Sequence, residues 1–203
     1  MSDGPVQLPD TPRGRATRAR IVAAAAELMH LRGVGATSIA DVLVASDTGK
    51  SQMYHYFSGK DRLVEAVLQH QLDQVLDMQR QFDVGTWDGI RSWFDAMLGQ
   101  QEARAFLGGC PLGSIIAEVG TRDHHLREVA ARAFQRWEDV LATGLQALQD
   151  RGELRDHADP GRLALETMAS IQGGYLLSTT ERQRRPMEIA LDAAWERIRS
   201  YAP

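Results

Sequence analysis

Apolar residues recur at helical spacing along most of this chain, and this periodicity is the strongest constraint on its fold. The clearest case is a segment from about 60 to 82, with apolar residues every three or four positions: Leu63, Val64, Val67, Leu68, Leu72, Val75, Leu76 and Phe82. No stretch alternates with period two beside hairpin turn residues, as a half-buried strand would. The sequence therefore predicts an all-α protein of about nine helices.

Capping and turn residues predict where these helices begin and end. Gly33 is a natural end for a first helix over about 16 to 31, and Thr37 or Ser38 caps a second, with Ser38 and Asp41 at capping-box spacing. Asp47 and Gly49, which both tolerate left-handed backbone, form a break before a short segment at about 50 to 57. The remaining helices are expected at about 60–82, 87–104, 112–119, 123–150, 159–181 and from 186 onward.

Composition indicates an ordinary soluble chain. Its 203 residues are 43% hydrophobic and 25% charged, and no apolar run approaches the roughly 20 residues that span a bilayer. Residues 1 to about 12 are rich in Pro, Gly and Asp, so we expect a disordered arm rather than a signal peptide, and a cytoplasmic protein. Cys110 is the sole cysteine. It is read as a buried small hydrophobe in preference to a catalytic thiol.

The charge distribution singles out the N-terminal third. The net charge is −4, but residues 1 to 62 contain eight Lys/Arg and six Asp/Glu, a balance of +2, whereas residues 63 to 203 carry −6. Four arginines and no acid lie between 11 and 20. They are interpreted either as a basic arm that touches the DNA backbone or as a solvated helix start: Arg13, Arg15, Arg18 and Arg20. Only this third is suited to phosphates.

The segment from 49 to 57 carries the chemistry of a DNA reader. Met53 and Phe57 are four residues apart and are expected to face the core. The outer surface is then formed by Lys50, Ser51, Gln52, Tyr54, His55 and Tyr56. Glutamine pairs with adenine, lysine with guanine or phosphate, and tyrosine hydroxyls with phosphate oxygens. Two short helices joined by a tight turn would place the second in the major groove. A small surface helix pair is the alternative.

These residues resemble a known family. The stretch TSIADVLVASDTGKSQMYHYFSGKDRLVEAVL is similar to the DNA-binding domain of the tetracycline-repressor (TetR) family over about residues 14 to 75. The resemblance implies that the outer residues of 50 to 56 face DNA, and that Thr37 or Ser38, together with Lys60, contact phosphates at helix starts. Asp47 and Thr48 replace the family's usual Gly-Val, and Gly49 its usual Ser or Pro. Gln52 stands where Thr or Ser is commoner, so the operator sequence is left open.

The C-terminal part resembles one subgroup of that family. It is similar to regulators related to the lincomycin-resistance repressor (LmrA/YxaF-like). The resemblance rests on three segments: GGCPLGSIIAEV, the residues from GEL to DP at 152 to 160, and IQGGYLL. The resemblance implies a helix-turn-helix domain at 14–74 and a ligand-binding and dimerisation domain at 75–203. The expected ligand-pocket residues are Trp93, Met97, Cys110, Phe134, Trp137, Met168, Gln172 and Tyr175, each of which is alternatively plain core.

Other patterns are weaker. Gly49-Lys50-Ser51 imitates the end of a phosphate-binding loop, but Val44 stands where that motif needs glycine. His124 and His125 are interpreted as a solvated pair rather than metal ligands. Gly173-Gly174, inside an expected helix, indicates close approach of another helix, across a dimer axis in preference to a kink or a pocket wall.

Together the patterns predict a dimeric, ligand-responsive transcriptional repressor that binds a palindromic operator and is released by an apolar or amphipathic small molecule, without cofactor or metal. The alternative is a helical small-molecule carrier or enzyme. It would need convergent catalytic groups, whereas Glu118, His124 and Cys110 are only separate suggestions.

Overall fold

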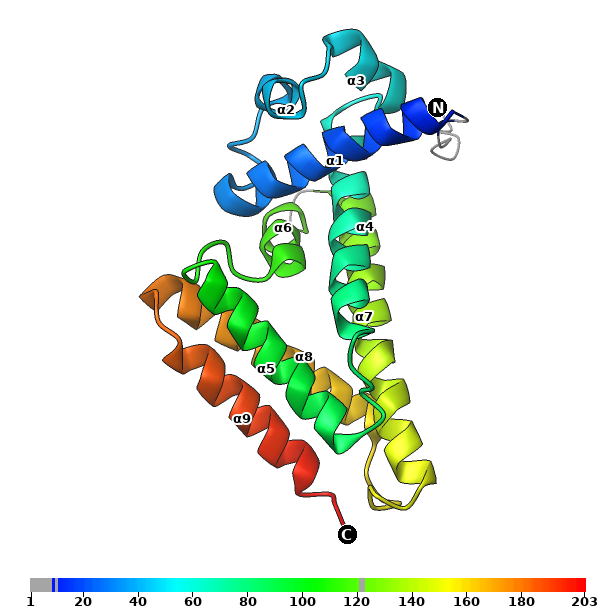
Figure 1. Ribbon diagram of the computed structural model, residues 1–203, viewed down its shortest axis with the longest axis vertical. Helices are drawn as coiled ribbons and strands as arrows, with labels where there is room; N and C mark the ends of the chain where they lie inside the picture. Colours follow the sequence, from blue (N-terminus) through cyan, green and yellow to red (C-terminus); the bar gives the residue numbers. More distant parts are fainter. Residues whose placement is uncertain (1–8, 10, 121–122) are drawn as a thin grey trace.

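The computed structural model describes residues 9, 11–120 and 123–203, and within them it consists of nine helices and no strand (Figure 1). The expected all-α fold is confirmed. In chain order the helices are α1 (Pro12–Arg32), α2 (Ile39–Ser46), α3 (Lys50–Tyr56), α4 (Lys60–Gln79), α5 (Trp87–Ala103), α6 (Pro111–Val119), α7 (His124–Asp150), α8 (Pro160–Glu181) and α9 (Arg185–Arg199).

Helices α1 to α3 form a compact unit at one end of the molecule (Figure 1). Ile21, Ala25 and Met29 lie on the buried face of α1. Met53 and Phe57 close this core from α3, with 0% and 2% of their surface exposed, so their predicted inward orientation is confirmed. The apolar anchoring of α3 leaves its opposite side free.

Helix α4 connects this unit to the rest of the protein. It contacts α1 at one end and runs alongside α7 (Figure 1). Its apolar stripe is buried along the whole length, from Leu63 to Leu76. The expected division between residues 74 and 75 falls inside this continuous helix.

Helices α5 to α9 form the larger body, in which α8 packs against both α7 and α9. Its largest fully buried side chains include Trp93, Phe94 and Trp137. Gly174 explains how closely α8 and α9 approach. A Cβ added there would lie 2.8 Å from Met187 Sδ and 2.9 Å from Ala190 Cβ, both in α9 of the same chain. Gly173, in contrast, faces open space. The close approach expected across a dimer axis is therefore, for Gly174, a contact within one chain.

Two helix ends differ from the expected ones. Helix α1 begins at Pro12 rather than near residue 16, because the Thr11 side chain accepts a hydrogen bond from the Gly14 N–H and proline suits the first helical position. Of the expected disordered arm, residues 1–8 and 10 lie outside the described residues. Helix α4 ends at Gln79 rather than near 82, because the next residues turn with tighter i→i+3 hydrogen bonds, such as Phe82 N–H to Gln79 C=O.

None of the helices in the described ranges is both long and apolar enough to cross a membrane.

The close packing at Gly174 and the open space at Gly99 predict opposite effects of an added methyl group on stability. Gly174→Ala should lower the free energy of unfolding by about 1–3 kcal/mol, because its methyl group overpacks the contact with Met187. Gly99→Ala is the matched control. It lies in the interior of α5 with nothing within 4 Å of an added Cβ, and it should raise stability by about 0.5–1 kcal/mol. Urea unfolding at one protein concentration measures both. Equal effects would contradict the assigned contact.

Candidate DNA-binding surface and effector cavity

The turn between α2 and α3 is held by local hydrogen bonds. Ser38 and Asp41 form the predicted capping box, in which Ser38 Oγ accepts from the Asp41 N–H at 3.1 Å and Asp41 Oδ2 accepts from the Ser38 N–H at 2.9 Å. Asp47 ends α2 with a left-handed φ of 48°, as its residue type allows. Gly49 has φ of −84°, which any residue adopts. The turn's departures from the family pattern therefore fit a regular helix-turn-helix.

Helix α3 presents a polar outer surface. Lys50, Ser51, Gln52, Tyr54 and His55 are all exposed. Gln52 Oε1 accepts from the Gly49 N–H at 3.2 Å, an exposed contact that a stronger partner could replace. The surface therefore offers amide, hydroxyl, imidazole and ammonium groups side by side.

The remaining expected DNA-binding residues differ in accessibility. Tyr56 is half-buried, with its ring edge against His55 at a centroid distance of 4.9 Å. Lys60 is half-buried at the start of α4. Thr37 is only 1% exposed, and its hydroxyl donates to the Gly33 carbonyl at 2.8 Å. Thr37 thus ties the start of α2 to the end of α1, while Ser38 is the exposed residue at that helix start.

The basic start of α1 divides into two groups. The Arg18 guanidinium lies over the Phe57 ring, 5.1 Å from its centroid, and burial lowers its pKa. Arg18 therefore packs against the core of α1 to α3. Arg13 and Arg20 are exposed, so their side chains are accessible to a DNA backbone.

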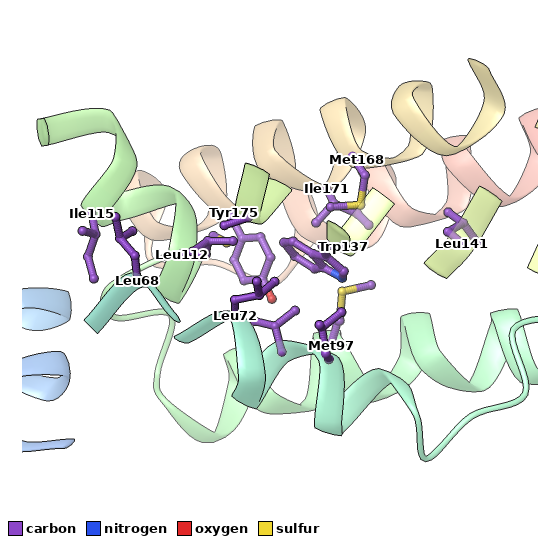
Figure 2. Close-up of a cluster of buried hydrophobic side chains, with 14 of the residues drawn as sticks. Leu68, Leu72, Met97, Leu112, Ile115, Trp137, Leu141, Met168, Ile171 and Tyr175 are labelled. Carbon is purple, nitrogen blue, oxygen red and sulfur yellow. The ribbon is translucent and has the colours of Figure 1, made fainter. Parts of the chain in front are cut away.

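The expected ligand-pocket residues come together in the larger body. Figure 2 shows Met97, Trp137, Met168 and Tyr175 in one buried cluster, to which α5, α7 and α8 contribute. Trp93 and Cys110 are also buried, whereas two of the set are half-buried: Phe134, whose ring stacks on Trp137, and Gln172, which contacts Cys110 Sγ at 3.5 Å. Most of the set therefore belongs to the packed core.

A cavity of about 270 Å³ opens into this cluster, and we call it the bundle cavity. It is close to the lower limit of about 300–1,000 Å³ for ligand sites. Trp137 and Tyr175 from the expected set line it. The rest of its lining consists of residues that the sequence analysis did not single out: Gln71, Gln74, Val75, Met78, Gln100, Arg104 and Pro111. Most of these are polar residues at helix edges, which an apolar stripe cannot reveal.

A second cavity, of about 530 Å³, lies between α1, α4 and the loop after α5, and we call it the junction cavity. Its lining shares Gln71, Gln74 and Arg104 with the bundle cavity. Arg104 Nη1 is 3.3 Å from His30 Nε2, and His30 Nδ1 is 3.3 Å from Ser114 Oγ. Burial and the Arg104 charge lower the pKa of His30, so its neutral ring accepts from Arg104.

Helix α6 is also attached to the segment that leads into α2. The Glu118 carboxylate accepts hydrogen bonds from the backbone N–H groups of Val34 and Gly35. The loop between α5 and α6 packs against the end of α1, since a Cβ at Gly108 would overlap the His30 ring. That loop holds two non-glycine residues, Ala105 and Phe106, at positive φ. The larger body therefore contacts the helix-turn-helix unit through α4 and α6.

Competing sites find little support. His124 and His125 are exposed and lie near Glu128 and Glu65, at 3.5 and 3.4 Å. In the described part of the chain, no three His, Cys, Asp or Glu side chains are grouped as metal ligands. Cys110 is buried and caps the start of α6, whereas Glu118 binds the backbone of the α1–α2 loop. The three groups suggested for catalysis therefore serve separate local contacts.

A helix-turn-helix with an exposed polar second helix, carried on a helical body with cavities open to its surface, defines a DNA-binding transcriptional regulator. Two family models agree. Residues 21–67 match the family described as bacterial regulatory proteins, tetR family. Residues 87–194 match the tetracyclin repressor-like, C-terminal domain. The chain belongs to the TetR family.

Individual relatives support this assignment along almost the whole chain. The uncharacterized HTH-type transcriptional regulator YxaF of Bacillus subtilis (strain 168) is 27% identical over 185 residues, covering 87% of this chain and 92% of that protein. The HTH-type transcriptional repressor DhaR of Mycobacterium sp. (strain GP1) is 23% identical over 188 residues, covering 89% and 91%. The predicted likeness to YxaF is confirmed.

Solved structures agree on the fold. A TetR transcriptional regulator from Chloroflexus aurantiacus J-10-fl aligns with a TM-score of 0.82 at 27% identity, covering 95% of this chain and 98% of that one. A TetR-family regulator from Cytophaga hutchinsonii aligns with a TM-score of 0.85 at 20% identity, covering 96% and 98%.

The contact between α6 and the α1–α2 loop predicts a local effect. Glu118→Ala should speed amide hydrogen exchange at Val34 and Gly35, because their N–H groups lose their acceptor, while exchange in α9 stays unchanged. Glu128→Ala is the control, since it removes only surface ion pairs of α7. Hydrogen-exchange mass spectrometry measures both. Unchanged exchange at residues 33–36 in Glu118→Ala would refute the contact.

Proposed function

We propose that this protein is a dimeric repressor whose α3 reads a palindromic DNA operator and which a small apolar or amphipathic molecule releases. The observation that carries the proposal is the exposed polar face of α3, held on a buried apolar anchor. The proposed contacts are Ser38, Lys50, Ser51, Gln52, Tyr54, His55, Tyr56 and Lys60. We assign Thr37 a positioning role, because its hydroxyl is buried against Gly33.

The proposed roles divide the chain into residues 14–74, which bind DNA, and 75–203, which bind the effector and dimerise. Because α4 spans this boundary without a break, we propose that the two parts move as coupled bodies rather than on a flexible linker. The proposed partner of residues 14–74 is double-stranded DNA. Because bacterial DNA lies in the cytoplasm, we propose a cytoplasmic location.

The proposed dimer interface is the outer face of α8 and α9. Four large apolar side chains are exposed there: Leu165, Leu176, Leu177 and Ile189, at 51–67%. Gly173 lies on the same helix with open space before it. Several large apolar side chains left exposed on two neighbouring helices are typical of an interaction site. A twofold dimer would present its two α3 helices about one DNA turn apart, hence the palindromic operator.

Release requires the effector to favour a conformation in which the two α3 helices are wrongly spaced for DNA. The supporting observations are the bundle cavity and the attachment of α6 to the α1–α2 loop through Glu118. The proposal needs no chemical step on the effector, so we propose that the protein is not an enzyme. The name of DhaR, a transcriptional repressor, favours repression over activation.

Two substitutions separate affinity from selectivity. Lys60→Ala should weaken binding to every DNA sequence and reduce the slope of log affinity against log salt by about one, because one phosphate contact is lost. Gln52→Ala should instead change the preferred operator, because it alters base contacts. Fluorescence anisotropy on a panel of fragments from upstream of the protein's own gene measures both. The control is Arg80→Ala, at the far end of α4.

That experiment has clear negative outcomes. A wild-type protein without salt-sensitive, sequence-selective binding would refute the repressor proposal. If Lys60→Ala and Gln52→Ala both bind the whole panel like wild type, the assigned reading surface is wrong.

The dimer proposal is tested by charge on the exposed face. Leu176→Arg should shift the protein toward a monomer, because this exposed leucine would place a charge inside the proposed apolar interface. Leu31→Arg, an exposed leucine of α1 away from α8 and α9, should leave the oligomeric state unchanged. Sedimentation velocity over a range of concentrations measures both. A Leu176→Arg protein that remains as dimeric as wild type would exclude this face.

A further inference from the structure

Arg104 occupies a position between the two cavities. It follows the last residue of α5 and lines both the bundle cavity and the junction cavity. Its contact on the junction side is with the neutral ring of His30, at 3.3 Å. In the described part of the chain, no ion pair joins Arg104 to an Asp or Glu, whereas arginines such as Arg91, Arg184 and Arg197 each have a carboxylate partner.

Every polar side chain around the bundle cavity can donate a hydrogen bond. Trp137 is 1% exposed, and its indole N–H has no hydrogen-bond partner among the described residues. Burial raises the pKa of Tyr175, so its phenol stays protonated and able to donate. The amides of Gln71, Gln74 and Gln100 can also donate, and none of the described lining residues is a carboxylic acid.

The apolar part of the lining indicates that a ligand of the bundle cavity also has an apolar part. Val75 and Met78 of α4 and the rings of Trp137 and Tyr175 form an apolar wall. A buried N–H without an acceptor costs free energy that a ligand oxygen would recover. A cation with free donor capacity at the rim favours a bidentate anion, since a planar guanidinium matches a carboxylate.

We propose that the effector is a small amphipathic carboxylate, whose apolar part fills the bundle cavity and whose carboxylate binds Arg104 in place of His30. This inference rests on the proposed function and specifies the ligand class. A carboxylate on the bundle side draws the guanidinium away from His30 at the end of α1. His30 then loses the charged donor that faces it, while its contact with Ser114 of α6 remains. Binding of a carboxylate in the bundle cavity therefore changes a contact of the helix-turn-helix unit, and Arg104 is the residue that links the two.

Calorimetric titration of the DNA-free, full-length protein tests the ligand class. The probes are matched pairs that differ only in the head group: octanoate and octanol, and phenylacetate and phenylethanol, with octylamine as the cationic counterpart. We expect at least one acid to bind about tenfold more tightly than its alcohol, as a charge-assisted hydrogen bond implies. Arg104→Gln should remove this preference and leave the binding of the alcohol unchanged. Arg104→Lys should keep part of it, because the charge remains without the fork.

Arg127→Gln is the matched control, since it removes an exposed arginine of α7 that lines neither cavity. It should keep the acid preference of wild type. Circular dichroism shows whether each variant is folded, and if Arg104→Gln is not, Arg104→Lys carries the test. Acids that bind no better than their alcohols, no binding by any acid, preference for octylamine, or an unchanged preference without Arg104 would each overturn the proposal.

A second measurement separates this inference from the proposed function. The acid that binds is added to the wild-type protein on its operator, and anisotropy is followed. Release by the acid but not by its alcohol supports both. Acid-selective binding by a protein that does not bind DNA would refute the repressor proposal and leave the ligand class supported. Release by alcohol and acid alike would retain the repressor and overturn the role of Arg104.

Discussion

The burial of one uninterrupted apolar stripe on α4 is the constraint on which the rest of the structure depends. The apolar residues from Leu63 to Leu76 are buried, against α1 at one end of the helix and against α7 beyond it. Interiors of this kind are close-packed, so they resist gradual deformation and shift between discrete arrangements. In the proposed release, a helix packed at both ends would pass a displacement of the body to the helix-turn-helix unit instead of absorbing it.

The contacts of α6 give this transmission a second route. Glu118 holds the backbone of the α1–α2 loop, and Ser114 faces His30 at the end of α1. These contacts are polar and few, in contrast to the apolar burial along α4. Polar contacts at a junction are individually weak. They can therefore exchange partners at small cost, while the apolar core of α1 to α3 keeps the DNA-reading surface intact as a unit.

Much of the fold was predictable from the sequence because helical periodicity and capping residues are local signals. The capping box at Ser38 and Asp41, the left-handed turn at Asp47, and the inward orientation of Met53 and Phe57 all follow from residues within one helical turn of each other. The partner of Gly174 does not, because a glycine indicates close approach without indicating which helix approaches.

The candidate site was predictable only in part for the same reason. The exposed face of α3 follows from its apolar anchors. The buried state of Thr37 depends on the loop conformation that brings its hydroxyl to the Gly33 carbonyl, four residues earlier, and residue type alone does not give that conformation. The pairing of Arg104 with His30 joins residues 74 positions apart. The sequence gives one weak indication of the Arg104–His30 pairing. Arg104 has no Asp or Glu three or four residues away in either direction, so its own helix gives it no partner for an ion pair.

The magnitude of the Arg104 exchange limits what it can do alone. Moving a two-state equilibrium from 1:99 to 99:1 needs about a 10⁴-fold difference in affinity, or about 5.5 kcal/mol. Replacing a neutral imidazole by a carboxylate at Arg104 is worth about tenfold, and most of the difference must come from elsewhere. The apolar wall of the bundle cavity is the available source, since each methylene that is buried in the released conformation but not in the DNA-binding one contributes about 0.8 kcal/mol. In this division, the carboxylate draws Arg104 from His30 and so selects which molecules act as effectors, and the burial of their apolar part adds to the preference for the released conformation once that exchange has occurred.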